Sequence, residues 1–324
     1  MMQRLSIVVK AAFAALVLAS SAACVAASYP DHPVRLIVPY PPGGPNDVLA
    51  RLLGERLTDA WKQQVVVENR AGAGGNIATE AAARSDPDGY TMVLPAMAYA
   101  VNPSLYTKVP YAFDDFTAVT IVAKGPLVLV VHPSFEAKSV GELINMAKRA
   151  PGKLNFASGG TGSSLHLAPE LFKLEAGIDM VHVPYKGTNA LLPDLLAGRV
   201  PIAFISPLTA EEYVKDGRLR ALGVTSKQRA AGWPDVPAIA EAGVPGYEME
   251  AWYALLVPAA TPKDVVRQLN TAVAKALASP RISEKLSGLG MTAVGNSPEE
   301  AAAYIRNEAA KWAKVARAAN IKAD

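Results

Sequence analysis

Apolar positions along this chain follow two spacings in turn, and their alternation predicts repeated strand and helix units. Residues 34–40, VRLIVPY, form a nearly continuous apolar run typical of a buried strand. Residues 46–61 then place apolar side chains between Val48 and Leu57 at helical spacing. Strands that alternate with helices in this way are typical of βαβ units and of a largely parallel sheet.

The same alternation continues to the end of the chain. We predict further strands at residues 63–69, 90–96, 117–123, 127–133, 153–158, 180–185, 200–206, 219–226, 248–259 and 291–295. We predict further helices at residues 74–85, 139–151, 163–177, 190–199, 210–218, 261–279 and from Ser297 onward. Lys124-Gly125-Pro126 is expected to separate the two apolar runs that flank it.

One layout occurs twice and predicts two α/β halves. Residues 36–57 and residues 154–177 each contain an apolar strand, a Gly-Gly pair, a short polar turn and a helix with periodic leucines. In open α/β sheets, ligands bind at the carboxyl ends of the strands. Two α/β domains that each present a Gly-rich helix start there would close around a ligand.

These two Gly-rich loops are the predicted ligand-binding features. A helix N-terminus leaves about four backbone N–H groups unpaired and carries roughly half a positive charge, so it binds anions without a cationic side chain. The expected ligand-binding residues are Gly43, Gly44, Asn46 and Asp47 in the first loop, and Ser158, Gly160, Thr161, Gly162, Ser163 and Ser164 in the second. The alternative is that the glycines only make turns and the polar residues only cap the helices.

Four residues outside the glycine pairs are also expected beside a ligand. Tyr40, Tyr99 and Ser206 fall near the carboxyl ends of predicted strands, where ligands bind in a doubly wound sheet. His166 lies one helical turn beyond the second loop. For each of them, packing in the core or helix capping is the alternative.

No pattern in the chain predicts catalysis. AGAGGN at residues 71–76 lacks the dinucleotide-binding fingerprint because Ile77 occupies the last glycine position, so we interpret it as a tight loop. The sequence contains no G-x-S-x-G elbow, and its 4 histidines show no metal-binding spacing. We predict no catalytic residue, cofactor or metal, and keep an exported enzyme as the alternative because a fold does not determine a function.

The first 27 residues are typical of a secretory signal peptide. Arg4 and Lys10 precede the apolar run AAFAALVLASSAA, and small residues continue to Ala27. We therefore place the mature start near Ser28 and predict a periplasmic protein. A retained anchor and lipidation at Cys24 are the alternatives, although Ser21 stands where a lipoprotein signal usually has a branched apolar residue.

Cleavage changes the charge and the available chemistry of the chain. It removes two basic residues and the 1 cysteine, and so takes the formal net charge from +3 to +1. A near-neutral exported chain without a basic run is not expected to bind nucleic acid. Without cysteine, thiol nucleophiles and disulfides are also excluded from the mature protein.

Motifs spread over the whole mature chain resemble one family. YPDHPVRLIVPYPPGGPNDVLAR, VVVENRAGAGGNIA, DPDGYT, GGTGSSLHL, VPYKG, LLAGRVPIAF, LRALGVTS, IAEAGVPGYE, WYALLVPAATP and VVRQLN occur in the order of the Bug/TctC family. Its members are extracytoplasmic solute receptors of tripartite tricarboxylate transporters.

The resemblance implies a type II periplasmic-binding-protein fold. Two α/β domains are then joined by a two-stranded hinge, with a ligand cleft between them. The implied domains are residues 28–125 with 253–324, and residues 126–252, and the hinge crossings fall near residues 124–127 and 252–256.

The resemblance also implies the ligand class and the loops that bind it. Family members bind small carboxylates, often through backbone amides, hydroxyls and ordered waters. The matching loops are Tyr40 to Asp47, Ala98 to Asn102 and Ser158 to Ser164, which add Ala98 to the expected ligand-binding residues. A bulky residue in place of Gly160 is then expected to abolish binding with little loss of fold.

One departure from the family refines the expected ligand. Many relatives carry an acidic residue where this chain has Ser206, and that group could pair with a ligand ammonium. We therefore favour a di-, tri- or aromatic carboxylate over an amino acid, with Lys186 available to offset a second carboxylate. The expected partners are membrane transporter subunits that receive ligand from a monomeric receptor. A receptor that feeds a chemosensor is the alternative.

Overall fold

The computed structural model describes residues 29–323, and their helices and strands lie in one compact unit that begins at Pro33. The predicted signal peptide and Cys24 lie outside the described residues. Within residues 29–323, no helix is both long enough and apolar enough to cross a membrane.

A six-stranded sheet organises the part of the fold that contains both chain ends of the compact unit. Its strands in spatial order are β11 (Thr292–Ala293), β4 (Phe116–Pro126), β10 (Glu250–Pro258), β3 (Thr91–Val93), β1 (Val34–Val38) and β2 (Val65–Asn69). β1 pairs in parallel with β2 and β3, whereas β10 runs antiparallel to both of its neighbours. The carboxyl ends of β1 and β3 therefore meet at the same edge of this sheet.

A five-stranded sheet organises the middle of the chain. Its spatial order is β7 (Val181–Pro184), β6 (Asn155–Ser158), β8 (Ile202–Ile205), β5 (Val128–Val131) and β9 (Arg220–Val224). β6 is parallel to β7 and β8, and β5 is antiparallel to β8 and β9. Each sheet thus has a parallel core, with β10 and the edge strand β11 reversed in the six-stranded sheet and β5 reversed in the five-stranded sheet. Both are close to the largely parallel sheets that the alternation predicts.

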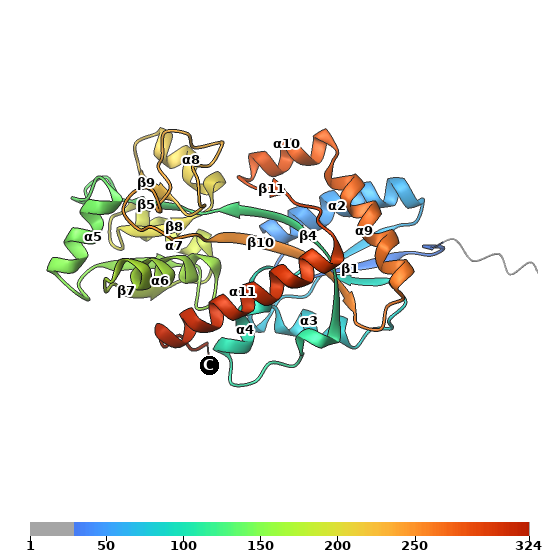
Figure 1. The fold of residues 1–324 in the computed structure, drawn as a ribbon. Coiled ribbons are helices and arrows are strands. Elements are labelled where there is room, and N and C mark those ends of the chain that lie inside the picture. The colour runs from blue at the N-terminus through green and yellow to red at the C-terminus, as the bar shows by residue number, and fades with distance from the viewer. Residues whose placement is uncertain (1–28, 324) are drawn as a thin grey trace, which may run out of the picture. The chain divides into compact units, whose positions relative to one another are not determined.

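Helices connect the strands of both sheets (Figure 1). Those associated with the six-stranded sheet are α2 (Pro45–Trp61), α3 (Asn76–Ala83), α4 (Ala98–Leu105), α9 (Lys263–Leu277), α10 (Pro280–Gly288) and α11 (Pro298–Ala318). Those associated with the five-stranded sheet are α5 (Val140–Arg149), α6 (Ser164–Ala176), α7 (Thr188–Leu196) and α8 (Pro207–Lys215). Two 3₁₀ turns, η1 (Ala73–Gly75) and η2 (Phe113–Asp115), complete the elements.

The predicted strands and helices are all present, and one expected break is wrong. Lys124, Gly125 and Pro126 belong to β4, and Leu127 is the one residue between β4 and β5. Gly125 stays in the strand opposite Ala251, where a Cβ atom would lie 2.6 Å from the Gly290 carbonyl oxygen. The glycine is therefore required by a close backbone contact rather than by a turn.

β4 and β10 lie side by side and lead from one sheet toward the other (Figure 1). Lys124 of β4 and Glu250 of β10 form an ion pair of 2.6 Å. At the start of β5, the Leu127 N–H donates to the hydroxyl of Thr225 at 2.7 Å, and the Thr225 N–H donates to the Leu127 carbonyl at 2.9 Å. The connection between the two sheets is thus held by specific polar contacts.

The C-terminal helix α11 is attached to the crossing strand β10 through one carboxylate. The indole N–H groups of Trp252 on β10 and of Trp312 on α11 both donate to Oε2 of Glu308 at 2.9 Å. Both tryptophans are fully buried. Because tryptophan has a single polar atom, this shared acceptor allows both rings to be buried without an unpaired donor.

Candidate functional site

The first predicted loop connects the buried strand β1 to α2. Helix α2 begins at Pro45, which tolerates the first helical position because it has no N–H to leave unpaired, and Gly44 is the N-cap. The capping alternative does not hold for this helix, because neither Asn46 nor Asp47 caps it with its side chain. The Asn46 amide instead donates to the Leu94 carbonyl at 3.0 Å and ties the helix start to the end of β3.

Asp47 holds the loop itself. Its carboxylate accepts the Gly43 N–H at 2.9 Å and an Arg51 N–H at 3.0 Å. The hydrogen bond from Arg51 lowers the pKa of Asp47 below its ordinary value, assisted by the Gly43 amide and opposed by burial. The loop therefore contains an ionised carboxylate that is already paired, and the Gly43 N–H is already used.

The loop AGAGGN packs beneath Tyr40 and is joined to α4. Its residues form the 3₁₀ turn η1, and a Cβ at Gly75 would lie 3.6 Å from the Tyr40 hydroxyl. The Asn102 amide of α4 donates to the Gly74 carbonyl at 3.1 Å and to Oδ1 of Asn76 at 2.7 Å. The tight-loop interpretation agrees with this geometry, and its polar groups connect neighbouring elements.

Residues 98–102 form the first turns of helix α4 rather than a loop. The Tyr99 ring is only 4% exposed; it stacks on Tyr111 at 5.3 Å and meets the edge of Phe113 at 5.3 Å. Apolar residues at helical spacing before Pro103 are the signal that could have predicted this helix. Tyr99 therefore packs in the core, and Ala98 starts the helix.

The second loop connects β6 to α6 and is held from below by side chains. The Gly160 N–H donates to Ser158 Oγ at 3.1 Å, and the Gly162 N–H donates to Nδ1 of His166 at 3.1 Å. The Ser163 hydroxyl donates to the Gly160 carbonyl at 2.7 Å. Gly160 and Gly162 have φ of +120° and +77°, a region that favours glycine.

Two stacked histidines lie under this loop. The rings of His166 and His182 are 3.8 Å apart and nearly parallel, and His182 Nε2 is 2.5 Å from Ser158 Oγ. Burial lowers the pKa of His166 to about 3 and that of His182 to about 4. Both imidazoles are therefore neutral at neutral pH.

The sequence did not identify His182, because its position depends on the register of β6 and β7. In the parallel pair β6 and β7, Phe156 lies opposite His182, so the side chain of His182 lies next to the carboxyl end of β6. Ser206 stands at the N-cap of α8, where its hydroxyl oxygen accepts the Thr209 N–H at 3.2 Å. For Ser206 the structure thus favours the capping alternative.

Several amide donors at the two helix starts remain unused. The N–H groups of Gly44, Asn46 and Asp47 take part in no hydrogen bond within residues 29–323. The same holds, over the described chain, for the second-loop N–H groups of Thr161, Ser164 and Leu165. Each loop thus combines amides fixed by its own side chains with amides left available for an anion.

The second loop also contacts the other half of the fold. A Cβ at Gly162 would lie 2.6 Å from Cδ1 of Leu105, the last residue of α4. Helix α4 is in turn attached to the 3₁₀ turn beneath Tyr40 through Asn102. Contacts therefore run from the first loop through α4 to the second loop.

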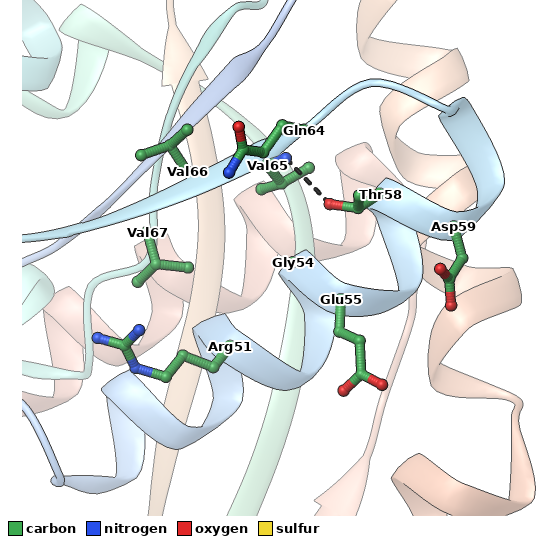
Figure 2. Close-up of a pocket in the computed structure, with 9 residues that line it drawn as sticks. All are labelled: Arg51, Gly54, Glu55, Thr58, Asp59, Gln64, Val65, Val66 and Val67. Carbon is green, nitrogen blue, oxygen red and sulfur yellow. Dashed lines mark hydrogen bonds between the residues drawn. The ribbon is translucent and has the colours of Figure 1, made fainter.

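A separate hollow is lined by residues of α2, of β2 and of the segment that joins them (Figure 2). It is lined by Arg51, Gly54, Glu55, Thr58, Asp59, Gln64, Val65, Val66 and Val67. Glu55 is paired with Arg281 of α10 at 2.6 Å. No residue of the predicted ligand loops lines this hollow, so it is a different feature of the surface.

Sequence comparisons place the chain in one family. Residues 49–321 match the model of the tripartite tricarboxylate transporter family receptor, TctC. The chain is 39% identical over 290 residues to the "UPF0065 protein in tcbD-tcbE intergenic region" of Pseudomonas sp., covering 89% of this chain and 86% of that protein. It is also 39% identical over 298 residues to Protein BugT of Bordetella pertussis, covering 91% of each.

Solved structures agree with the sequence comparison. A Rhodopseudomonas palustris protein solved with adipate, Rpa4515, is 38% identical with a TM-score of 0.81, covering 91% of this chain and 99% of that one. MatC from the same species, solved with bound malate, is 29% identical with a TM-score of 0.77, covering 89% and 99%.

The class of protein is defined by its two helix-flanked sheets, each of which carries a Gly-rich helix start. The fold is the α/β fold of periplasmic binding proteins. Within that class, the chain belongs to the TctC family, whose members are solute-binding receptors, and the expected family is confirmed.

Proposed function

We propose that this protein is a periplasmic receptor that captures a small dicarboxylate between its two Gly-rich loops and delivers it to membrane transporter subunits. The observation that supports the proposal most strongly is the set of unused amides at the starts of α2 and α6. Amides of Gly44 and Asn46 belong to one set, and those of Thr161 and Ser164 to the other. Two separated anion sites suit a ligand with a carboxylate at each end.

The electrostatics of the first loop agree with such a ligand. Asp47 is ionised and paired with Arg51, so this pair adds little net charge beside the ligand. Binding then depends on backbone dipoles. These recognise a carboxylate group but discriminate weakly between different molecules that contain one. Relatives solved with adipate and with malate fit this expectation.

The mechanism that we propose is a shift between an open and a closed arrangement. We place the hinge crossings near residues 124–127 and 252–256, with domain boundaries close to residues 125 and 252. Ligand favours the closed arrangement only through the extra contacts it makes there. Membrane subunits then recognise the closed form.

Isothermal titration with adipate, malate and the uncharged diamide of each tests the proposal. We expect the diacids to bind and the diamides not to bind, because an amide carries no charge for the helix starts to stabilise. A ligand recovered chemically unchanged after prolonged incubation agrees with a receptor. Conversion of the ligand supports an exported enzyme instead.

Two matched glycine substitutions locate the site. Gly44 and Gly141 both have ordinary φ angles, and an added Cβ meets nothing closer than 3.8 Å at Gly44 and nothing within 4 Å at Gly141. We expect G44A to bind the diacid at least tenfold more weakly, about 1.4 kcal/mol, because the methyl group blocks approach to the first loop. G141A, at the start of α5, should bind like the unchanged protein. If both variants bind the diacid with equal affinity, the assignment of the first loop as a ligand-binding loop is contradicted.

A further inference from the structure

Two amides of the second loop are turned inward onto side chains of the five-stranded sheet and α6. The Gly162 N–H donates to Nδ1 of His166, and the Gly160 N–H donates to Ser158 Oγ, each at 3.1 Å. Ser158 Oγ then contacts His182 Nε2 at 2.5 Å. Ser158 is fully buried and His166 is 4% exposed, so water does not replace these partners.

The hydrogen positions in this network follow from the donors. His166 Nδ1 receives an N–H and therefore carries no proton, which leaves the proton of the neutral ring on Nε2. Ser158 Oγ accepts from Gly160 and is also hydrogen-bonded to Nε2 of His182. Each histidine thus supports a different glycine of the loop: His166 binds Gly162 directly, and His182 is linked to Gly160 through Ser158 Oγ.

We propose that His166 and His182, acting with Ser158, are positioning residues that orient the second loop for ligand capture. The proposal rests on the proposed function, because it assigns these side chains to the same binding site. Glycines at φ of +120° and +77° have no side chain to fix their peptide planes. Holding the Gly160 and Gly162 amides inward leaves those of Thr161 and Ser164 for the ligand.

The surroundings of the histidines favour this role over simple packing. Phe156 stacks on His182 at 5.2 Å and continues the column of rings, so an aromatic residue would satisfy packing alone at either histidine position. The charged groups nearby are on α6 and just after it. Glu170 lies 3.7 Å from His166 Nε2, and Lys173 pairs with Glu170 and approaches Asp179.

Ring-preserving substitutions separate positioning from packing. H166F and H182F keep an aromatic ring in the stack and remove the ring nitrogen that forms the hydrogen bond. H166N places an amide oxygen near the position of Nδ1, and H182Q places one near that of Nε2. H132N, at the half-buried His132 outside this network, is the control.

The measurements are the dissociation constant for adipate and malate, amide hydrogen exchange of the two glycines, and the urea midpoint. We expect H166F and H182F to bind at least tenfold more weakly, and H166N and H182Q to return within about threefold of the unchanged protein. H166F should accelerate exchange mainly at Gly162, and H182F mainly at Gly160.

Two results overturn the inference. One is diacid binding by both phenylalanine variants at unchanged affinity; the other is equal weakening by the phenylalanine and the amide-containing variants. If the unchanged protein binds neither diacid, the proposed function fails. Exchange at Gly160 and Gly162 then still decides the inference, because unaltered exchange in H166F and H182F contradicts it.

Discussion

The shared acceptor between α11 and β10 leads to a prediction about stability. E308A removes the carboxylate that receives the indole N–H groups of Trp252 and Trp312, each at 2.9 Å. Both rings are fully buried, so the two donors are left without a partner. A buried donor without a partner costs about 1–3 kcal/mol, and two such donors should lower the free energy of unfolding by about 2–6 kcal/mol.

Two further variants make the comparison specific to the hydrogen bonds. E308Q retains an acceptor oxygen and loses only the charge, so we expect a loss of about 1–2 kcal/mol. N307A changes the exposed neighbour on the same helix and should stay within about 0.5 kcal/mol of the unchanged protein.

Urea unfolding followed by tryptophan fluorescence and circular dichroism measures all three variants. Fluorescence also reports directly on the environment of the two indoles. The reasoning is refuted if E308A and N307A unfold at the same urea concentration, because two buried donors would then have lost their acceptor at no cost.

Three shorter predictions follow. The lowered pKa values of His166 and His182, about 3 and about 4, mean that the unfolded chain binds protons the folded chain does not. The contribution of these two neutral rings to the free energy of unfolding is therefore complete above pH 6.5. It declines on acidification by up to about 1.4 kcal/mol per pH unit for each ring. Urea midpoints should therefore fall from pH 7 to pH 5 in the unchanged protein but stay level in the double variant H166F/H182F. G160A should unfold about 1–3 kcal/mol more easily in urea, because its φ of +120° strains an alanine; unchanged stability would restore the expectation that this position tolerates substitution. R281A breaks the exposed pair with Glu55 and should change stability by less than about 1 kcal/mol; a larger loss contradicts its treatment as a surface pair.

Much of the fold was predictable because its signals are local. The apolar run of β1 forms a buried strand, and the periodic leucines of α2 form the buried face of a helix. The spacing of apolar residues is therefore sufficient to identify both elements. The repeated layout at residues 154–177 likewise predicted a second sheet. The family motifs then supplied the class of fold.

What sequence patterns did not predict depends on contacts between distant segments. His182 reaches Ser158 only because β6 and β7 pair in one particular register. Gly125 is required by the approach of Gly290, 165 residues later in the numbering (290 − 125), which no local pattern encodes. No local pattern showed that the Asp47 carboxylate would bind Gly43 and Arg51 rather than cap α2.

Equilibrium unfolding of the mature protein with and without ligand tests the central claim most directly. A ligand at about 100 times its dissociation constant should raise the free energy of unfolding by roughly 2.7 kcal/mol. The account predicts this gain for at least one small diacid from a panel of di-, tri- and aromatic carboxylates, and no gain for its diamide. Equal stabilisation by diacid and diamide, or no stabilisation by any carboxylate in the panel, would contradict it.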